Sequence, residues 1–225
     1  MSEIIAIVGD TGTGKTASLE SLTPSTTAMC NVVGKPLSFR GWKKNYTPFK
    51  GDTGNYLASD DYKVILKFMK HISDSRPEIT ELVIDDGQYL MSNEFMKRSS
   101  EKGYEKFTEL AYHMWLVITE AAKLREDLKV IFLMHDEQLI NKDDFTTMRK
   151  IKTIGKMLDD KITLEGLFTI VLFTTVEHSD KGNKYQFMTQ TDGTTRAKSP
   201  REMFSELLIP NDMKMVVDTI DEYYG

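Results

Sequence analysis

Several common features are missing from this sequence of 225 residues. Cysteine occurs once, at Cys30, so the chain has neither an internal disulfide nor a zinc site built from several cysteines. No apolar run approaches the roughly 20 residues of a membrane-spanning helix, and no basic leader precedes the first apolar residues. We therefore expect a cytoplasmic protein of a reducing compartment that makes no use of a membrane.

A basic excess is also missing. The chain has 29 lysines and arginines against 34 aspartates and glutamates, which gives a net charge of −5. This balance excludes a nucleic-acid-binding protein whose whole surface is basic. Nucleic-acid binding must then come from local basic segments or from a surface that several subunits build together. The length fits one domain over residues 1–225, with no visible linker or internal repeat.

A glycine-rich motif near the start of the chain is the most informative stretch. Residues 9–16 read G-D-T-G-T-G-K-T, after the apolar run 4–8 and before a predicted helix that contains Leu19 and Leu22. The pattern G-x-x-x-x-G-K-[ST] between a strand and a helix is typical of a loop that binds the phosphates of a nucleotide. We call residues 9–16 the phosphate loop. The alternative is a glycine-rich turn without a ligand.

The motif assigns a role to each part of the loop. Backbone N–H groups would surround the phosphates of ATP, and the start of the helix would add its positive dipole. Lys15 would contact the outer phosphates, and the Thr16 hydroxyl would bind Mg²⁺. The expected nucleotide-binding residues are Gly9, Asp10, Thr11, Gly12, Thr13, Gly14, Lys15, Thr16 and Ala17.

An acidic pair ends the second landmark, residues 81–86 (ELVIDD). Three consecutive apolar residues predict a strand that is buried on both faces of a parallel sheet. Open α/β sheets bind ligands at the carboxyl ends of their strands. Asp85 is therefore the candidate Mg²⁺ residue, and Asp86 is a candidate to orient or deprotonate the attacking water. Either carboxylate could instead cap the following helical turn.

A second buried strand is predicted over residues 129–134 (KVIFLM), and it ends at His135. In folds where an extra strand separates the phosphate-loop strand from the acidic strand, this segment is that strand. His135 would then lie near the γ-phosphate as a polar sensor of the nucleotide state. The alternative is a histidine whose hydrogen bonds are satisfied at a strand end.

Basic residues gather in three places. Residues 35–50 carry five basic and no acidic residues, and aromatic residues lie between them. Rings and cations in alternation are typical of single-strand binding surfaces. The alternative is that the rings attach a long connection over residues 35–57 to the domain. The second basic place is a polar break after residue 96, for which a solvated helix end is the alternative. The third is the stretch that follows residues 136–147, and we expect residues 136–147 themselves to form a loop. The candidate DNA-binding residues are Arg40, Lys43, Lys44, Lys97, Arg98, Arg149, Lys150 and Lys152.

The C-terminal third predicts a β-hairpin from two strands, residues 167–177 and 184–190. Arg196 and Lys198 follow it, and in an extended segment side chains two residues apart point the same way. Such a pair suits a finger that enters a neighbouring subunit's nucleotide site. The alternative is that the two cations are ordinary surface charge. Residues 211–223 predict a C-terminal helix.

These motifs together resemble a known family. The phosphate loop, the acidic strand, the strand ending at His135 and the hairpin before Arg196 and Lys198 occur in RecA-core order. The chain resembles the compact phage-encoded RecA-like ATPases, in particular the Sak-type single-strand annealing and recombination proteins. Residues 34–42 also look like that family. The resemblance implies an α/β fold with a RecA-like P-loop NTPase core, in which helices flank a mostly parallel central sheet that carries a C-terminal β-hairpin.

The resemblance also implies a function. The protein would be an oligomeric Mg²⁺-ATP-dependent ATPase, in a ring or filament with ATP between subunits. It would bind single-stranded DNA and promote strand annealing in phage recombination or replication in the bacterial host cytoplasm, alongside a single-strand binding protein. The residues carried over are Lys15 and Thr16 for phosphate and Mg²⁺, Asp85 for the metal, His135 as sensor, and Arg196 and Lys198 acting in trans.

One part of the family pattern is missing, because the catalytic glutamate of RecA-type proteins has no counterpart where the strand before Gly34 ends. Asp86, or another carboxylate, is left as the base. Two other functions stay open. The chain may be a nucleotide-gated loader that acts on a protein partner. A small-molecule P-loop kinase is the other alternative, although the arginine-rich lid that such enzymes usually have is missing.

Overall fold

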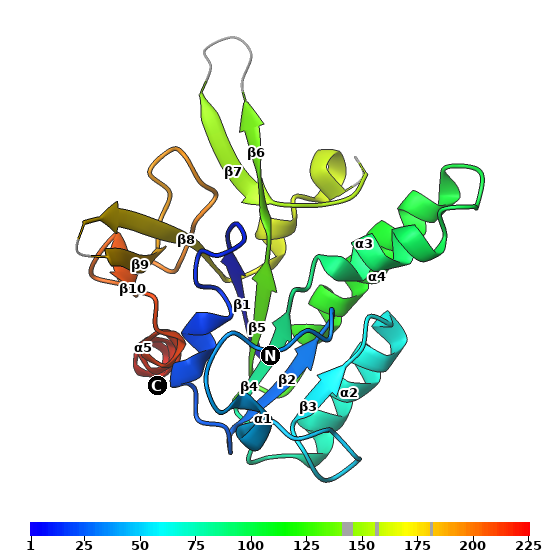
Figure 1. Ribbon diagram of the computed structural model, residues 1–225, viewed down its shortest axis with the longest axis horizontal. Helices are drawn as coiled ribbons and strands as arrows, with labels where there is room; N and C mark the ends of the chain where they lie inside the picture. The colour runs from blue at the N-terminus through cyan, green and yellow to red at the C-terminus, as the bar shows by residue number, and fades with distance from the viewer. Residues whose placement is uncertain (141–145, 156–157, 181) are drawn as a thin grey trace.

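The computed structural model describes residues 1–140, 146–155, 158–180 and 182–225. Within these residues the strands form one eight-stranded sheet and one two-stranded sheet (Figure 1). The strands are β1 Glu3–Val8, β2 Thr27–Asn31, β3 Tyr56–Ala58, β4 Glu81–Asp85, β5 Lys129–Met134, β6 Asp136–Ile140, β7 Thr147–Ile151, β8 Ile170–Ser179, β9 Gly182–Met188 and β10 Leu208–Pro210. The α-helices are α1 Trp42–Asn45, α2 Tyr62–Ser75, α3 Tyr89–Lys97, α4 Glu105–Ala121 and α5 Met213–Tyr224.

The large sheet has the strand order β10-β9-β8-β1-β5-β4-β2-β3. Its strands from β8 to β3 run parallel, whereas β9 pairs antiparallel with β8, and β10 pairs antiparallel with β9. Strand β5 lies between β1 and β4, as the sequence predicts, and the β8–β9 hairpin is confirmed. The large sheet is thus mostly parallel and has helices on both faces, as the sequence predicts. It brings the carboxyl ends of β1, β4 and β5 together at one edge of the sheet.

Alternating side chains of the central strands form two cores, one on each face of the sheet. On β1, Ile4, Ala6 and Val8 pack with the buried faces of α2, α3 and α4. Ile5 and Ile7 point to the opposite face and pack with α5 and with Leu19. Such burial on both sides explains why the central strands are continuous apolar runs in the sequence.

The segment after the phosphate loop differs from the prediction, because it is not an α-helix. Residues Ala17–Ser21 form a short 3₁₀ helix, η1. The hydroxyls of Ser18 and Ser21 donate to the carbonyls three residues before them, which competes with α-helical bonding. Pro24 then disfavours helical geometry at Thr23. The helix whose dipole should contribute to phosphate binding is therefore short, and α5 packs beside η1 on this face of the sheet (Figure 1).

The expected loop over residues 136–147 is also wrong in part. Strands β6 and β7 pair antiparallel, with Asp136 opposite Ile151 and Ile140 opposite Thr147, and residues 141–145 lie outside the described part. This pairing satisfies the backbone N–H and C=O groups of the segment. The polar, non-periodic sequence does not indicate the pairing. In Figure 1 this hairpin and the α3–α4 pair both extend beyond the large sheet.

The expected C-terminal helix is present as α5, and the Asp212 side chain caps it by accepting a hydrogen bond from the Met215 N–H. Residues 35–57, predicted to lack regular structure, contain the single turn α1 and end in β3. Throughout the described residues, the structure contains no helix with the length and hydrophobicity to cross a membrane.

Candidate nucleotide-binding site

Two expected metal ligands meet at the edge of the sheet. The Thr16 hydroxyl, which follows β1, donates to Asp85 Oδ1 at the end of β4 over 3.1 Å. Asp85 is fully buried, and its Oδ2 has no hydrogen-bond partner among the residues that the structure describes. Burial, and then the neighbouring charge of Asp86, raises the pKa of the Asp85 carboxyl to about 6.

This arrangement fits Mg²⁺. A carboxylate oxygen without a partner and an adjacent hydroxyl are oxygen ligands of the kind that Mg²⁺ prefers. Among the described residues, however, no group of three or more histidines, cysteines, aspartates or glutamates is arranged to hold a metal. Thr16 and Asp85 would therefore hold the ion together with phosphate oxygens and water, as Mg²⁺ is usually bound beside a nucleotide.

Lys15 is held inside its own loop. Its Nζ donates to the main-chain carbonyls of Gly9 and Asp10, each at 2.8 Å. Burial lowers the pKa of the Lys15 ammonium, an effect that the nearby carboxylates of Asp86 and Asp136 partly oppose. Phosphate oxygens are stronger acceptors for an ammonium group than neutral carbonyls are. The loop thus places Lys15 where an entering phosphate can replace two carbonyls.

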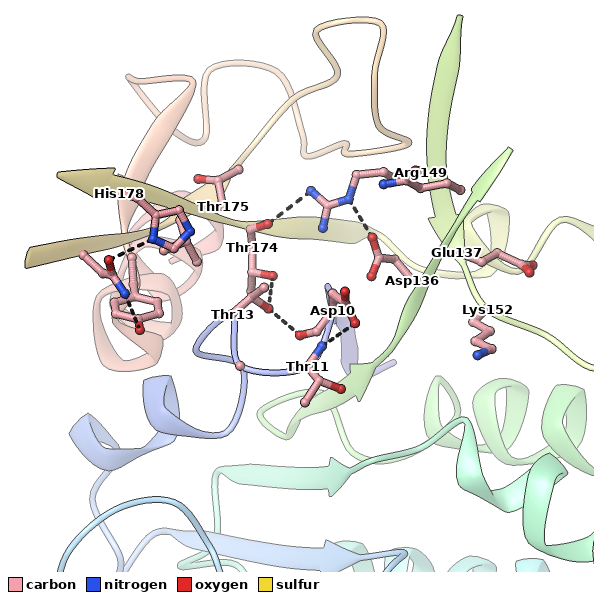
Figure 2. A pocket seen from close by; sticks show the side chains of 15 residues that line it. Asp10, Thr11, Thr13, Asp136, Glu137, Arg149, Lys152, Thr174, Thr175 and His178 are labelled. Carbon is pink, nitrogen blue, oxygen red and sulfur yellow. Dashed lines mark hydrogen bonds and ion pairs between the residues drawn. The ribbon is translucent and has the colours of Figure 1, made fainter. Parts of the chain in front are cut away.

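Strand β8 explains why the phosphate loop begins with glycine. A Cβ at Gly9 would lie 1.7 Å from the Thr174 hydroxyl, so any larger residue would have to displace the Thr174 side chain. Thr174 donates to the Thr13 hydroxyl at 2.7 Å, and Thr13 in turn donates to the Asp10 carbonyl at the same distance (Figure 2). The sequence motif does not identify Thr174, because its contact depends on β8 pairing with β1.

Asp86 lies at the centre of a group of three side chains. Lys35 Nζ lies 2.5 Å from Asp86 Oδ2, and His135 Nε2 lies 3.6 Å from Asp86 Oδ1. Burial alone would raise the pKa of the Asp86 carboxyl, but interactions with His135 and Lys35 hold it below its ordinary value. The main-chain N–H of His135 donates to Gln88 Oε1 at 3.1 Å, and Tyr89 meets the His135 ring edge to face.

A cavity of about 880 Å³ joins these groups. Lys15, Thr16, Lys35, Asp86 and His135 are among its lining residues, and β9 and the start of α5 contribute others. The structure therefore brings the phosphate loop, Asp86 and His135 into one cavity, as the sequence predicts. It adds Lys35, which the sequence alone indicates only as part of a basic segment.

Arg196 and Lys198 lie together but have a partner in their own chain. Arg196 Nη1 is 3.3 Å from Glu165 Oε2. Burial lowers the pKa of the Lys198 ammonium, and Glu165 partly opposes this. Glu165 is itself buried and accepts a hydrogen bond from the Ile151 N–H at 2.7 Å. A role of the pair in a neighbouring subunit stays a prediction, and Arg196 would have to exchange Glu165 for a phosphate.

The aromatic side chains of the 35–50 segment pack against the domain. Phe39 and Tyr46 are buried, the Trp42 ring lies 5.7 Å from the Tyr56 ring, and Phe49 packs edge to face on α2. These rings are not free for base stacking in this arrangement. DNA binding by the segment would rest on its exposed cations, among them the candidates Arg40, Lys43 and Lys44.

Several other candidate DNA-binding cations are paired within the chain. Lys97 contacts Asp60 at 2.7 Å, and Arg98 contacts three glutamates of α3, α4 and the turn between them. The buried Lys150 lies 3.0 Å from Glu137. Lys152 is exposed and lines a second cavity, of about 760 Å³, beside the phosphate loop (Figure 2).

Arg149 connects the β6–β7 hairpin to the phosphate loop. Its Nε lies 2.6 Å from Asp136 Oδ2, and its Nη1 donates to the Thr174 carbonyl at 3.2 Å (Figure 2). Because Thr174 also contacts Thr13, a continuous series of hydrogen bonds leads from β7 to the loop. A sequence of polar residues could not show this, since the contacts join three separate strands.

Comparison with known proteins gives a family and a distant structural likeness. A family model described as "AAA domain" matches residues 2–201. No curated protein matches the sequence significantly. Among solved structures, a KaiC-like protein from the hyperthermophilic archaeon Pyrococcus horikoshii OT3 shares 10% identity at a TM-score of 0.48, over 88% of this chain and 83% of that one.

Proposed function

The chain belongs to the AAA-domain family, and from this premise we propose that it is a P-loop ATPase that works on single-stranded DNA. The observation that carries the ATPase is the meeting of Thr16 and Asp85 at 3.1 Å beside Lys15. A hydroxyl, a buried carboxylate and an ammonium group arranged in this way match the requirements of a bound Mg²⁺-nucleoside triphosphate. The DNA, the assembly and the phage role are further parts of the proposal.

The proposed catalysis is electrostatic. Mg²⁺ bound with the nucleotide would neutralise charge on the phosphates. Lys15 would bind the outer phosphate oxygens, and Asp85 with Thr16 would fix the metal. Asp86 would orient the attacking water and accept its proton, with His135 beside it. A cation from the next subunit, Arg196 or Lys198, would complete the site, and such fingers contribute roughly 10³–10⁵ in rate.

Two projections support a nucleic-acid partner. The tip of the α3–α4 pair presents Tyr104 and Met96, 87% and 66% exposed, next to the exposed Lys102. The β6–β7 hairpin presents Leu139 and Ile140. Exposed rings and apolar side chains beside cations suit unstacked bases and their backbone. The hydrogen bonds from Arg149 through Thr174 to the phosphate loop would then connect a DNA strand bound at the β6–β7 hairpin with the nucleotide.

We further propose that copies of this chain assemble with ATP between subunits, and that the assembly anneals complementary strands in phage recombination or replication. This part rests on the resemblance to Sak-type proteins. A single-strand binding protein would be the accompanying partner. A loader that acts on another protein is the second candidate, since the exposed apolar tips also suit a protein surface.

Nucleotide-dependent DNA binding tests the proposal. We expect a labelled single-stranded oligonucleotide to bind more tightly with a non-hydrolysable ATP analogue than with ADP, and affinity to fall with salt because cations meet phosphates. Lys15→Ala should lose the difference between the nucleotides. Lys43→Ala with Lys44→Ala should reduce the salt slope. The absence of single-strand binding at low salt, with nucleotide bound, would reject the DNA proposal and leave the loader.

A further inference from the structure

Lys35 is held in place by the end of strand β2. The buried Asn31 is the last residue of that strand, and its side chain makes two hydrogen bonds to the turn that follows. Its Nδ2 donates to the Lys35 carbonyl at 2.8 Å, and its Oδ1 accepts from the Gly34 N–H at the same distance. Gly34 has a φ of 72°, which suits glycine and turns the chain sharply. The backbone of Lys35 is therefore fixed at the edge of the sheet.

The side chain of Lys35 has more freedom than its backbone. It is 48% exposed and contacts the Asp86 carboxylate, which is almost fully buried. Strands β2 and β4 are neighbours with Asn31 opposite Asp85, so the turn after β2 lies beside the acidic pair. A four-carbon stem that is half in solvent lets the ammonium group move while its Cα stays in place.

Lys15 and Lys35 line the same cavity from opposite elements, the phosphate loop and the turn after β2. Each ammonium group lowers the electrostatic cost of placing an anion in that cavity. Asp86 is the carboxylate that now offsets Lys35. An incoming terminal phosphate carries more negative charge than one carboxylate and would compete for the same ammonium group.

We propose that Lys35 is a second phosphate-binding lysine, which leaves Asp86 for the terminal phosphate of ATP and returns to Asp86 when ADP is bound. The inference rests on the proposed ATP-binding function of this cavity. It assigns Lys35 two roles. It distinguishes the triphosphate from the diphosphate, and it releases Asp86 to face the attacking water only when a terminal phosphate is present.

The test compares ATP and ADP affinities, measured by calorimetry with a non-hydrolysable ATP analogue in the absence of DNA. Lys35→Met keeps the stem and removes the charge. We expect it to weaken the analogue about tenfold, as the loss of one charge-assisted hydrogen bond does, and to change ADP affinity by no more than about twofold. Asp86→Asn removes the competing carboxylate, so we expect the analogue to bind more tightly while ADP is little changed.

Lys67→Ala, an exposed lysine of α2, is the matched control and should leave both affinities unchanged. A purely structural ion pair predicts something else, namely that Lys35→Met and Asp86→Asn weaken both nucleotides equally and lower the melting temperature together. That result, or an unchanged ratio of the two affinities, would overturn the inference. If the unaltered protein binds neither nucleotide, the proposed ATPase function fails instead, so the two failures can be told apart.

Discussion

At the scale of single residues, a side chain that the proposed function needs lowers the stability of the nucleotide-free protein. Asp85 is fully buried with one oxygen unpartnered, and an ionised carboxylate in such a place is costly without a cation. The Asp85 pKa of about 6, against 3.8 for an unperturbed aspartate, means that folding favours the protonated carboxyl. The residue that would hold the metal therefore destabilises the nucleotide-free protein at neutral pH.

Replacing Asp85 with asparagine should stabilise the free protein. Because the folded pKa is raised, the contribution of Asp85 to the free energy of unfolding is greatest below about pH 4 and falls as the pH rises through about 6. A shift of this size is worth about 2–3 kcal/mol. We expect urea unfolding, with chelator and without nucleotide, to show a fall between pH 4 and 7.5 that Asp85→Asn lacks. The exposed Asp74→Asn should behave like the unaltered protein, and equal pH slopes for all three would contradict this explanation.

The residue-level predictions for the phosphate loop rest on a local motif. The phosphate loop predicted Lys15 and Thr16 because strand, glycines and lysine are consecutive in the sequence. Lys35 was not identified as part of the site, because its contact with Asp86 exists only after β2 has paired with β4. Thr174 was missed for the same reason. Pairing between distant strands leaves no mark at the single residues that it brings together.

At the scale of elements, burial decided what could be predicted. Strands β1, β4 and β5 are continuous apolar runs, so their position in a parallel sheet was predictable. Strand β6 is polar and mostly exposed, so its sequence resembles that of a loop. The 3₁₀ geometry of η1 depends on serine hydroxyls and a nearby proline, which change the helix type without changing its apolar spacing.

The segment after the β8–β9 hairpin has its own prediction. If Arg196 acts in a neighbour's site, Lys15→Ala and Arg196→Ala subunits should each be inactive in ATP hydrolysis, and mixing them should restore activity. With random assembly in equal amounts, roughly a quarter of the interfaces would be complete. The measurement is steady-state ATP turnover across mixing ratios. Glu165→Gln controls for the ion pair, since it frees Arg196 without removing it. No recovery at any ratio would mean that Arg196 is a structural partner of Glu165.

At the scale of the whole molecule, the charge and the shape fit an assembly better than an isolated binder. With a net charge of −5, one subunit has little general attraction for a polyanion. Its exposed apolar tips lie on the hairpin and on the α3–α4 pair, both of which extend beyond the sheet (Figure 1). Several copies could place these projections along one strand. The family match supports an ATPase, whereas binding to single-stranded DNA is our proposal.

ATP hydrolysis with and without single-stranded DNA tests the central claim most directly. We expect little turnover by the protein alone and a rise of at least about tenfold with a long single strand, since DNA would align subunits and complete each site. Lys15→Ala should abolish turnover in both conditions. Turnover that no nucleic acid changes, in a protein that binds ATP, would contradict the account and favour a loader whose stimulus is another protein.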